Sequence, residues 1–86
     1  MIHELKIQEA FYEAVLSGDK TFEIRKNDRG FQKGDTLILI KVDELGIKSL
    51  SDIIKCKVSY VLSGWGIQEG HVVLGLTNVR EICNEN

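Results

Sequence analysis

The chain has 86 residues, 43% hydrophobic and 28% charged, which is an ordinary composition for one globular domain. It has no apolar run near the ~20 residues of a membrane span and no secretory signal, so we expect a single domain over residues 1–86, cytoplasmic and without membrane contact. The net charge of −2 excludes a general nucleic-acid coat, and Cys56 and Cys83 form neither a disulfide framework nor a metal site.

The N-terminal part of the chain predicts a strand followed by a helix. Residues 3–7 alternate weakly between apolar and polar side chains, as a strand does. Residues 8–17 are the one good helix candidate, because they continue an apolar stripe at three- and four-residue spacing. The stripe consists of Ile7, Ala10, Phe11, Ala14 and Val15. Gly18 is placed to end the helix in a left-handed conformation.

Residues 20–26 predict a second strand whose alternation sorts the side chains onto two faces. Phe22 and Ile24 are expected to face the core. The other face then carries a polar row, which is what a recognition site on a rigid strand needs. That row is Thr21, Glu23, Arg25 and Asn27.

Charge also gathers in this region. Residues 20–33 hold five cations and two anions, a net charge of +3, so the remainder of the chain carries −5. Such a basic patch on an acidic body suits a small anionic ligand or one exposed nucleotide. On charge alone, a solvated turn of mixed charge is the simpler interpretation.

The remaining elements are predicted from turn residues and alternation. Turns are predicted at 27–30 and 32–35, followed by a strongly apolar strand at 36–42, which is either buried on both faces or part of a barrel wall. A polar connector at 43–52 leads to a strand at 53–62. A glycine-rich loop at 63–70, a strand at 71–82 and a frayed end at 83–86 complete the chain. In the strand at 53–62, one face is expected to carry Ile54, Cys56, Val58, Tyr60 and Leu62. Together they predict an α+β fold, a small mixed β-barrel of about five strands with one early α-helix.

Gly18-x-Lys20-x-x-Glu23-x-Arg25 resembles the signature of the ASCH domain, a branch of the PUA-like superfamily. The run over residues 20–35, which contains Glu-Ile-Arg-Lys-Asn-Asp-Arg, resembles a small bacterial and phage subfamily without a settled function. The resemblance extends over nearly the whole chain. It implies a PUA-like barrel in which this motif lines a cleft.

Seven residues are candidates for ligand binding: Lys20, Glu23, Arg25, Lys26, Asn27, Arg29 and Trp65. Glu23 and Arg25 lie two apart on one strand face, where an arginine fork can pair with a carboxylate. This pair either presents an acceptor and a donor to a nucleobase or braces the barrel. Arg29 is suited to clamping a phosphate or stacking on a base. Trp65, between two glycines, is either a stacking platform or a lid over the barrel end.

The favoured function is an RNA- or nucleotide-binding module that recognises a nucleobase and phosphate in a cleft lined by residues 20–29. One alternative is an amidohydrolase acting on an N4-acylated cytidine, with Lys20 and Glu23 as reactive pair. The resemblance implies a catalytic lysine at this point, with a threonine three residues later, where this chain has Glu23. Another alternative is a protein-interaction accessory domain. We expect no cofactor or metal, since His3 and His71 lack ligand spacing.

Overall fold

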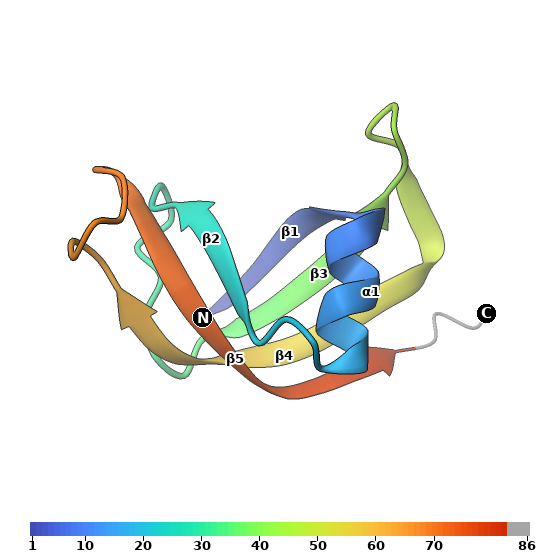
Figure 1. Cartoon of the computed structure of the whole chain (residues 1–86). Helices are drawn as coiled ribbons and strands as arrows, with labels where there is room; N and C mark the ends of the chain where they lie inside the picture. The colour runs from blue at the N-terminus through green and yellow to red at the C-terminus, as the bar shows by residue number, and fades with distance from the viewer. Residues whose placement is uncertain (83–86) are drawn as a thin grey trace.

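The computed structural model describes residues 1–82, which form one α-helix and five β-strands (Figure 1). In chain order the elements are β1 (Ile2–Gln8), α1 (Glu9–Ser17), β2 (Phe22–Lys26), β3 (Thr36–Val42), β4 (Lys48–Leu62) and β5 (His71–Ile82). The fraying predicted for residues 83–86 concerns a segment outside the described residues. Within residues 1–82, no helix is long and apolar enough to cross a membrane.

All five strands belong to one sheet, in the order β1-β3-β4-β5-β2. β1 pairs with β3 in parallel, and the other neighbouring strands are antiparallel. The sheet curls into a half-barrel with β1 and β2 as its two edges, and α1 stands beside its open side (Figure 1). The predicted α+β class, with about five strands in a small mixed barrel and one early helix, is confirmed.

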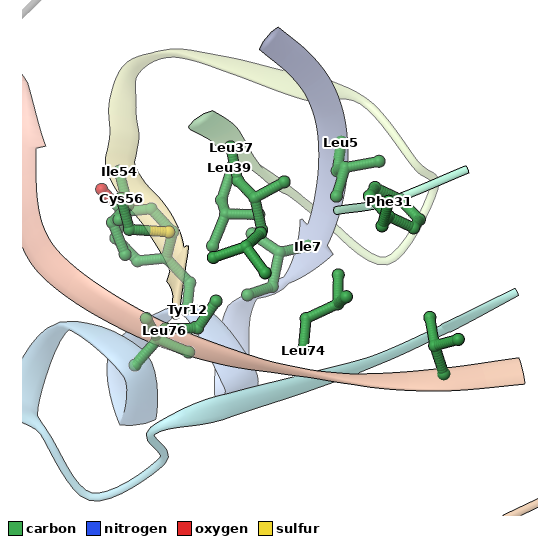
Figure 2. Packing of buried hydrophobic residues seen from close by; sticks show 13 residues of the cluster. Leu5, Ile7, Tyr12, Phe31, Leu37, Leu39, Ile54, Cys56, Leu74 and Leu76 are labelled. Atoms are coloured by element: carbon green, nitrogen blue, oxygen red, sulfur yellow. The ribbon is translucent and has the colours of Figure 1, made fainter. Parts of the chain in front are cut away.

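The hydrophobic core fills the inside of the curl. Leu37, Leu39, Ile54 and Leu74 have no exposed surface, and they come from three strands of the sheet (Figure 2). On the opposite face of β3, Ile38 is only partly buried. The apolar run at 36–42 therefore forms a barrel wall, with one face turned fully toward the core.

The helix packs with a different face from the one predicted. Tyr12 and Val15 are buried, whereas Phe11 is 47% exposed. Val15 is buried as predicted, but Tyr12 takes the place of its neighbour Phe11, about 100° further around the axis. The Tyr12 hydroxyl donates a hydrogen bond of 2.6 Å to Glu81, and burial together with this carboxylate raises the pKa of Tyr12. Gly18 ends the helix with φ 89°, as predicted.

The faces of β2 are the reverse of the prediction. Glu23 is 3% exposed and faces the inside of the curl, whereas Phe22 is 40% and Ile24 57% exposed. The cross-strand partner of Glu23 is the fully buried Leu74. The prediction assumed that apolar side chains take the inner face, but at this edge Glu23 takes it together with the cations that bind it. Burial of a carboxylate is tolerated there because cations bind it.

β4 begins earlier than predicted and changes face near its end. It starts at Lys48, so residues 48–52 belong to a strand and not to a connector. Cys56 and Val58 face the core as expected, but Tyr60 is 62% exposed and Val61 packs against the core instead. The register with β5 shifts between Val58 and Tyr60, which inverts the alternation. Burial raises the pKa of the Cys56 thiol to about 11.

A buried polar cluster fastens the start of β1 to the turn before β3. The Asp35 carboxylate accepts hydrogen bonds from the Gln32 backbone N–H at 2.9 Å and from His3 Nε2 at 2.8 Å. The Met1 ammonium lies 3.2 Å from the same carboxylate, and the His3 ring packs edge-on against Phe31. The Gln32 hydrogen bond first, and then His3, lowers the pKa of Asp35 from 3.8 to about 2. His3 is therefore a structural residue.

The inversion of β2 can be tested with two alanine substitutions. Leu74→Ala should lower the free energy of unfolding by about 2–5 kcal/mol, because it leaves a cavity in a fully buried site. Ile24→Ala should cost less than about 1 kcal/mol, since this side chain is mostly exposed. Urea denaturation measures both. Equal losses for the two variants would mean that Ile24 is a core residue after all.

Asp35 should make the fold sensitive to acid. Because its pKa is lower in the folded chain than its ordinary 3.8, its contribution to stability is complete above about pH 4 and disappears as the pH falls toward 2. Urea midpoints measured between pH 7 and pH 2 should fall less steeply in Asp35→Asn, which is also less stable at pH 7. Asp19→Asn, which changes an exposed turn residue, is the control and should keep the wild-type slope.

Candidate ligand-binding groove

A groove lies along the opening of the half-barrel, between its two edge strands. Its volume is about 480 Å³. It is lined by residues 6–8 of β1, by Phe11 of α1, by Lys20, by residues 23–26 of β2 and by His71. Segments far apart in the sequence therefore meet here, and the curl of the sheet is what brings them together.

The buried carboxylate of Glu23 organises the floor of this groove. Lys20 Nζ binds its Oε2 atom. Arg25 binds its Oε1 atom with Nε at 3.0 Å and Nη2 at 2.7 Å. The Arg25 fork therefore grips one carboxylate oxygen and the lysine grips the other. The predicted pairing of Glu23 with Arg25 is present, and it lies inside the curl.

Arg25 also connects the two edges of the sheet. Its Nη2 atom donates a second hydrogen bond, of 2.7 Å, to the main-chain carbonyl of Lys6 on β1. A guanidinium group has five N–H donors, and three are used by Glu23 and Lys6. Within residues 1–82, the two N–H groups of Nη1 have no protein acceptor. They remain free for a ligand.

Lys20 is held at the end of the groove by the chain around it. Its backbone N–H donates to the Ala14 carbonyl at 2.9 Å, directly after the turn at Gly18. Its ammonium lies 4.7 Å from the ring centre of Phe11 and 5.2 Å from that of Phe22. Each such cation–π contact contributes about 0.5–1 kcal/mol. The ammonium is thus fixed by two rings and one carboxylate.

Arg29 lies beyond the groove and reaches the same edge strand. Its Nη1 atom donates to the Glu4 carbonyl at 3.0 Å. Arg29, Arg25 and Lys48 contribute to a neighbouring hollow of about 420 Å³. Arg25 and Lys6 line both this hollow and the groove, so the Arg25 bridge stands between the two spaces.

Of three other predicted residues, one lines the groove and two do not. Lys26 is exposed and lines the groove. Asn27 does not line it, and its backbone N–H donates to the Gly70 carbonyl at 2.8 Å. Trp65 is 92% exposed on the loop between β4 and β5, with φ 55°, and it is not among the groove residues. The interpretation of Trp65 as a lid that fills the barrel end is therefore wrong.

The sequence analysis did not assign six of the lining residues to a site, namely Lys6, Ile7, Gln8, Phe11, Ile24 and His71. Lys6 lies on the edge strand β1, Phe11 points out of the helix toward Lys20, and His71 begins β5 with Nδ1 3.3 Å from the Glu69 carbonyl. The position of each depends on which strands are edges, and no local pattern carries that information. No group of three or more potential metal-ligating side chains occurs in the part of the chain that the structure describes.

Residues 2–76 match a family described as a domain of unknown function, DUF3850. The chain belongs to this family. A relative in Escherichia phage P2, the "Uncharacterized 12.9 kDa protein in GpA 3'region", is 50% identical over 38 residues. That alignment covers 44% of this chain, and the chain spans about a third (35%) of the relative's length. The expected small family without an assigned function, represented in phage, is confirmed.

The DUF3850 match includes every residue that lines the groove. The groove is therefore part of the matched domain, and it is assembled from both ends of that domain, from Lys6 to His71. Among the elements that build it, only the segment from Lys20 to Lys26 was singled out by sequence.

Replacing Glu23 should disturb the fold of this DUF3850 protein as well as the groove. Glu23→Gln leaves two partly buried cations without their carboxylate, and the free energy of unfolding should fall by about 3 kcal/mol, near the lower end for breaking a buried pair. The control is Asp28→Asn, because Asp28 is exposed and lies 3.8 Å from Arg29. That change should cost less than about 0.5 kcal/mol. Similar unfolding curves for both variants would contradict the central role of Glu23.

Proposed function

We propose that the groove binds RNA or a nucleotide through its phosphate and one base. The observation that carries this proposal is the Glu23 cluster, in which Lys20 and Arg25 are fixed in place while keeping unused donors. Lys6 and Lys26 add two further cations. Against these four positive charges stands one carboxylate, so the groove has a net charge of +3 in a chain whose net charge is −2.

The free donors favour a ligand rich in acceptors. The two N–H groups of Arg25 Nη1 suit two phosphate oxygens, and the ammonium groups of Lys6 and Lys26 are within the same groove lining. Phe11, half exposed at the groove, offers a ring against which a base can stack. Glu23 has both oxygens occupied, so in this proposal it orients Lys20 and Arg25 more than it reads a base.

The resemblance to ASCH domains of the PUA-like superfamily supports the same proposal. There the motif segment lines a cleft, and here Lys20, Glu23 and Arg25 of that motif line a groove in a curled sheet. A second hollow beyond Arg25 favours RNA over a lone nucleotide, because a neighbouring phosphate would meet Arg29 there; Lys48 lines the same hollow but is paired with Glu4 at 3.2 Å. Asn27 and Trp65 lie outside both linings. A cytoplasmic location, where such ligands occur, belongs to the proposal.

The contact between Lys20 and Glu23 is the observation that favours the second candidate, an amidohydrolase acting on an N4-acylated cytidine. None of the side chains described as lining the groove carries a hydroxyl, and Thr21 is exposed outside it. Hydrolysis would therefore need a water molecule as nucleophile, with Glu23 or His71 as the general base. Water would add to the acyl carbon, the C–N bond would break, and acetate and cytidine would leave.

Binding can be measured by fluorescence anisotropy with a labelled single-stranded RNA octamer. If about three phosphates are neutralised, the logarithm of the binding constant should fall against the logarithm of salt concentration with a slope of about −2. Lys26→Gln should weaken binding and reduce the slope by about 0.7, because it removes one groove cation that has no ion-pair partner among the described residues. Arg25→Ala should abolish detectable binding.

The matched control is Lys33→Gln, which removes a cation from an exposed turn outside the groove. It should leave both affinity and slope unchanged. Equal weakening by Lys33→Gln and Lys26→Gln, or no binding at low salt, would overturn the proposal. Release of acetate from N4-acetylcytidine that disappears in Lys20→Ala would establish the hydrolase instead, and silence in both assays would favour a protein partner.

A further inference from the structure

The outer face of the sheet carries a second cluster of cations, far from the groove lining. Lys55 of β4 stands directly opposite Arg80 of β5 in the antiparallel register, and Lys57 follows two residues along β4. The residue between the two lysines, Cys56, is buried. Because side chains alternate along a strand, the lysines therefore point to the outer face, whereas Glu23 points to the inner face.

Among residues 1–82, which the structure describes, no carboxylate is paired with this cluster. The structure gives Lys55, Lys57 and Arg80 no ion pair with any residue in 1–82. The acidic residues nearest in sequence are engaged elsewhere, since Asp52 binds Lys41 at 3.1 Å and Glu81 accepts the Tyr12 hydroxyl. Like charges directly opposite each other on neighbouring strands destabilise a sheet. In a chain with more acids than bases, three cations on one face that are unpaired within residues 1–82 offer a place for an anion.

The backbone forms a hollow at this cluster. Lys55 pairs with Arg80 and Lys57 pairs with Thr77. The two β4 residues are two positions apart and the two β5 residues are three apart, so β5 contains one extra residue here, a β-bulge. Asn78 stands there with φ 55°, a left-handed conformation uncommon outside glycine. The resulting hollow, of about 420 Å³, is lined by the three cations, by Asn78 and by their neighbours. A bulge of this kind re-aims side chains, and the Asn78 amide adds a neutral donor.

We infer that this outer hollow is a second anion-binding site, which takes a phosphate group between Lys55, Lys57 and Arg80. The guanidinium group can bind two phosphate oxygens, and the two ammonium groups face the remaining charge. An anion between these cations offsets their mutual repulsion, because each cation attracts it. The inference stands independently of the groove, which lies on the other face of the sheet. Free phosphate and the phosphodiester of a polynucleotide share this chemistry.

Amide chemical shifts of ¹⁵N-labelled protein test the inference. Inorganic phosphate, added at constant ionic strength against chloride, should move the amide signals of residues 55–57 and 77–80. The double variant Lys55→Gln/Arg80→Gln should weaken this response at least tenfold. The control, Lys33→Gln, removes a cation from an exposed turn outside both the groove and the outer hollow, and it should keep the response.

The same titration with an unlabelled RNA octamer distinguishes the two sources of phosphate. If the outer site saturates at a lower concentration of RNA phosphate than of free phosphate, its ligand is the polynucleotide. If it saturates at a lower concentration of free phosphate, its ligand is the free ion. Unmoved signals at 55–57 and 77–80 with both probes, or an equal response in the Lys55→Gln/Arg80→Gln variant, would overturn the outer site. If the proposed RNA binding in the groove is wrong, Lys26→Gln will not change the affinity for RNA, whatever the result at the outer site.

Discussion

The hydrogen-bonded cluster of Glu23, Lys20 and Arg25 is the interaction on which the groove depends. A carboxylate that is 3% exposed needs cations to offset its desolvation, and both cations are supplied by the same short segment of chain. Well-packed apolar side chains are often at least as stabilising as a buried ion pair. The charges at this position are therefore better explained by what they present to the groove than by what they add to stability.

Arg25 of this cluster and the neighbouring Arg29 also satisfy part of an open edge of the half-barrel. A curled sheet that does not close leaves two strands with unpaired main-chain groups, which invite association with other chains. Here, arginine side chains extend across the opening and bind the carbonyls of Glu4 and Lys6. These two carbonyls belong to alternate residues of β1, so they point to the same side of that strand. Side chains thus replace part of the strand pairing that a closed barrel would have.

Much of the fold could be predicted from local pattern, because turns, one helix and four of the five strand locations carry strong signals. What could not be predicted was which face of each element lies inside. Phe11 and Tyr12 are neighbours, and both suit a core, but only the placement of α1 beside the opening selects Tyr12. Phe22 and Ile24 are exposed because the inner face at the β2 edge carries Glu23 with its two cations. In β4, an irregular register exchanges the roles of Tyr60 and Val61.

The candidate site shows the same division between local and global information. Lys20, Glu23 and Arg25 could be selected by residue type and spacing, whereas Lys6 and His71 join them only through the strand order. The bridge formed by Arg25 has one more consequence. The bond from Nη2 to the Lys6 carbonyl lies where the groove and the neighbouring hollow meet, and Glu23 holds the same guanidinium group in place. The boundary between the two spaces is therefore set by one arginine side chain that is anchored at both ends.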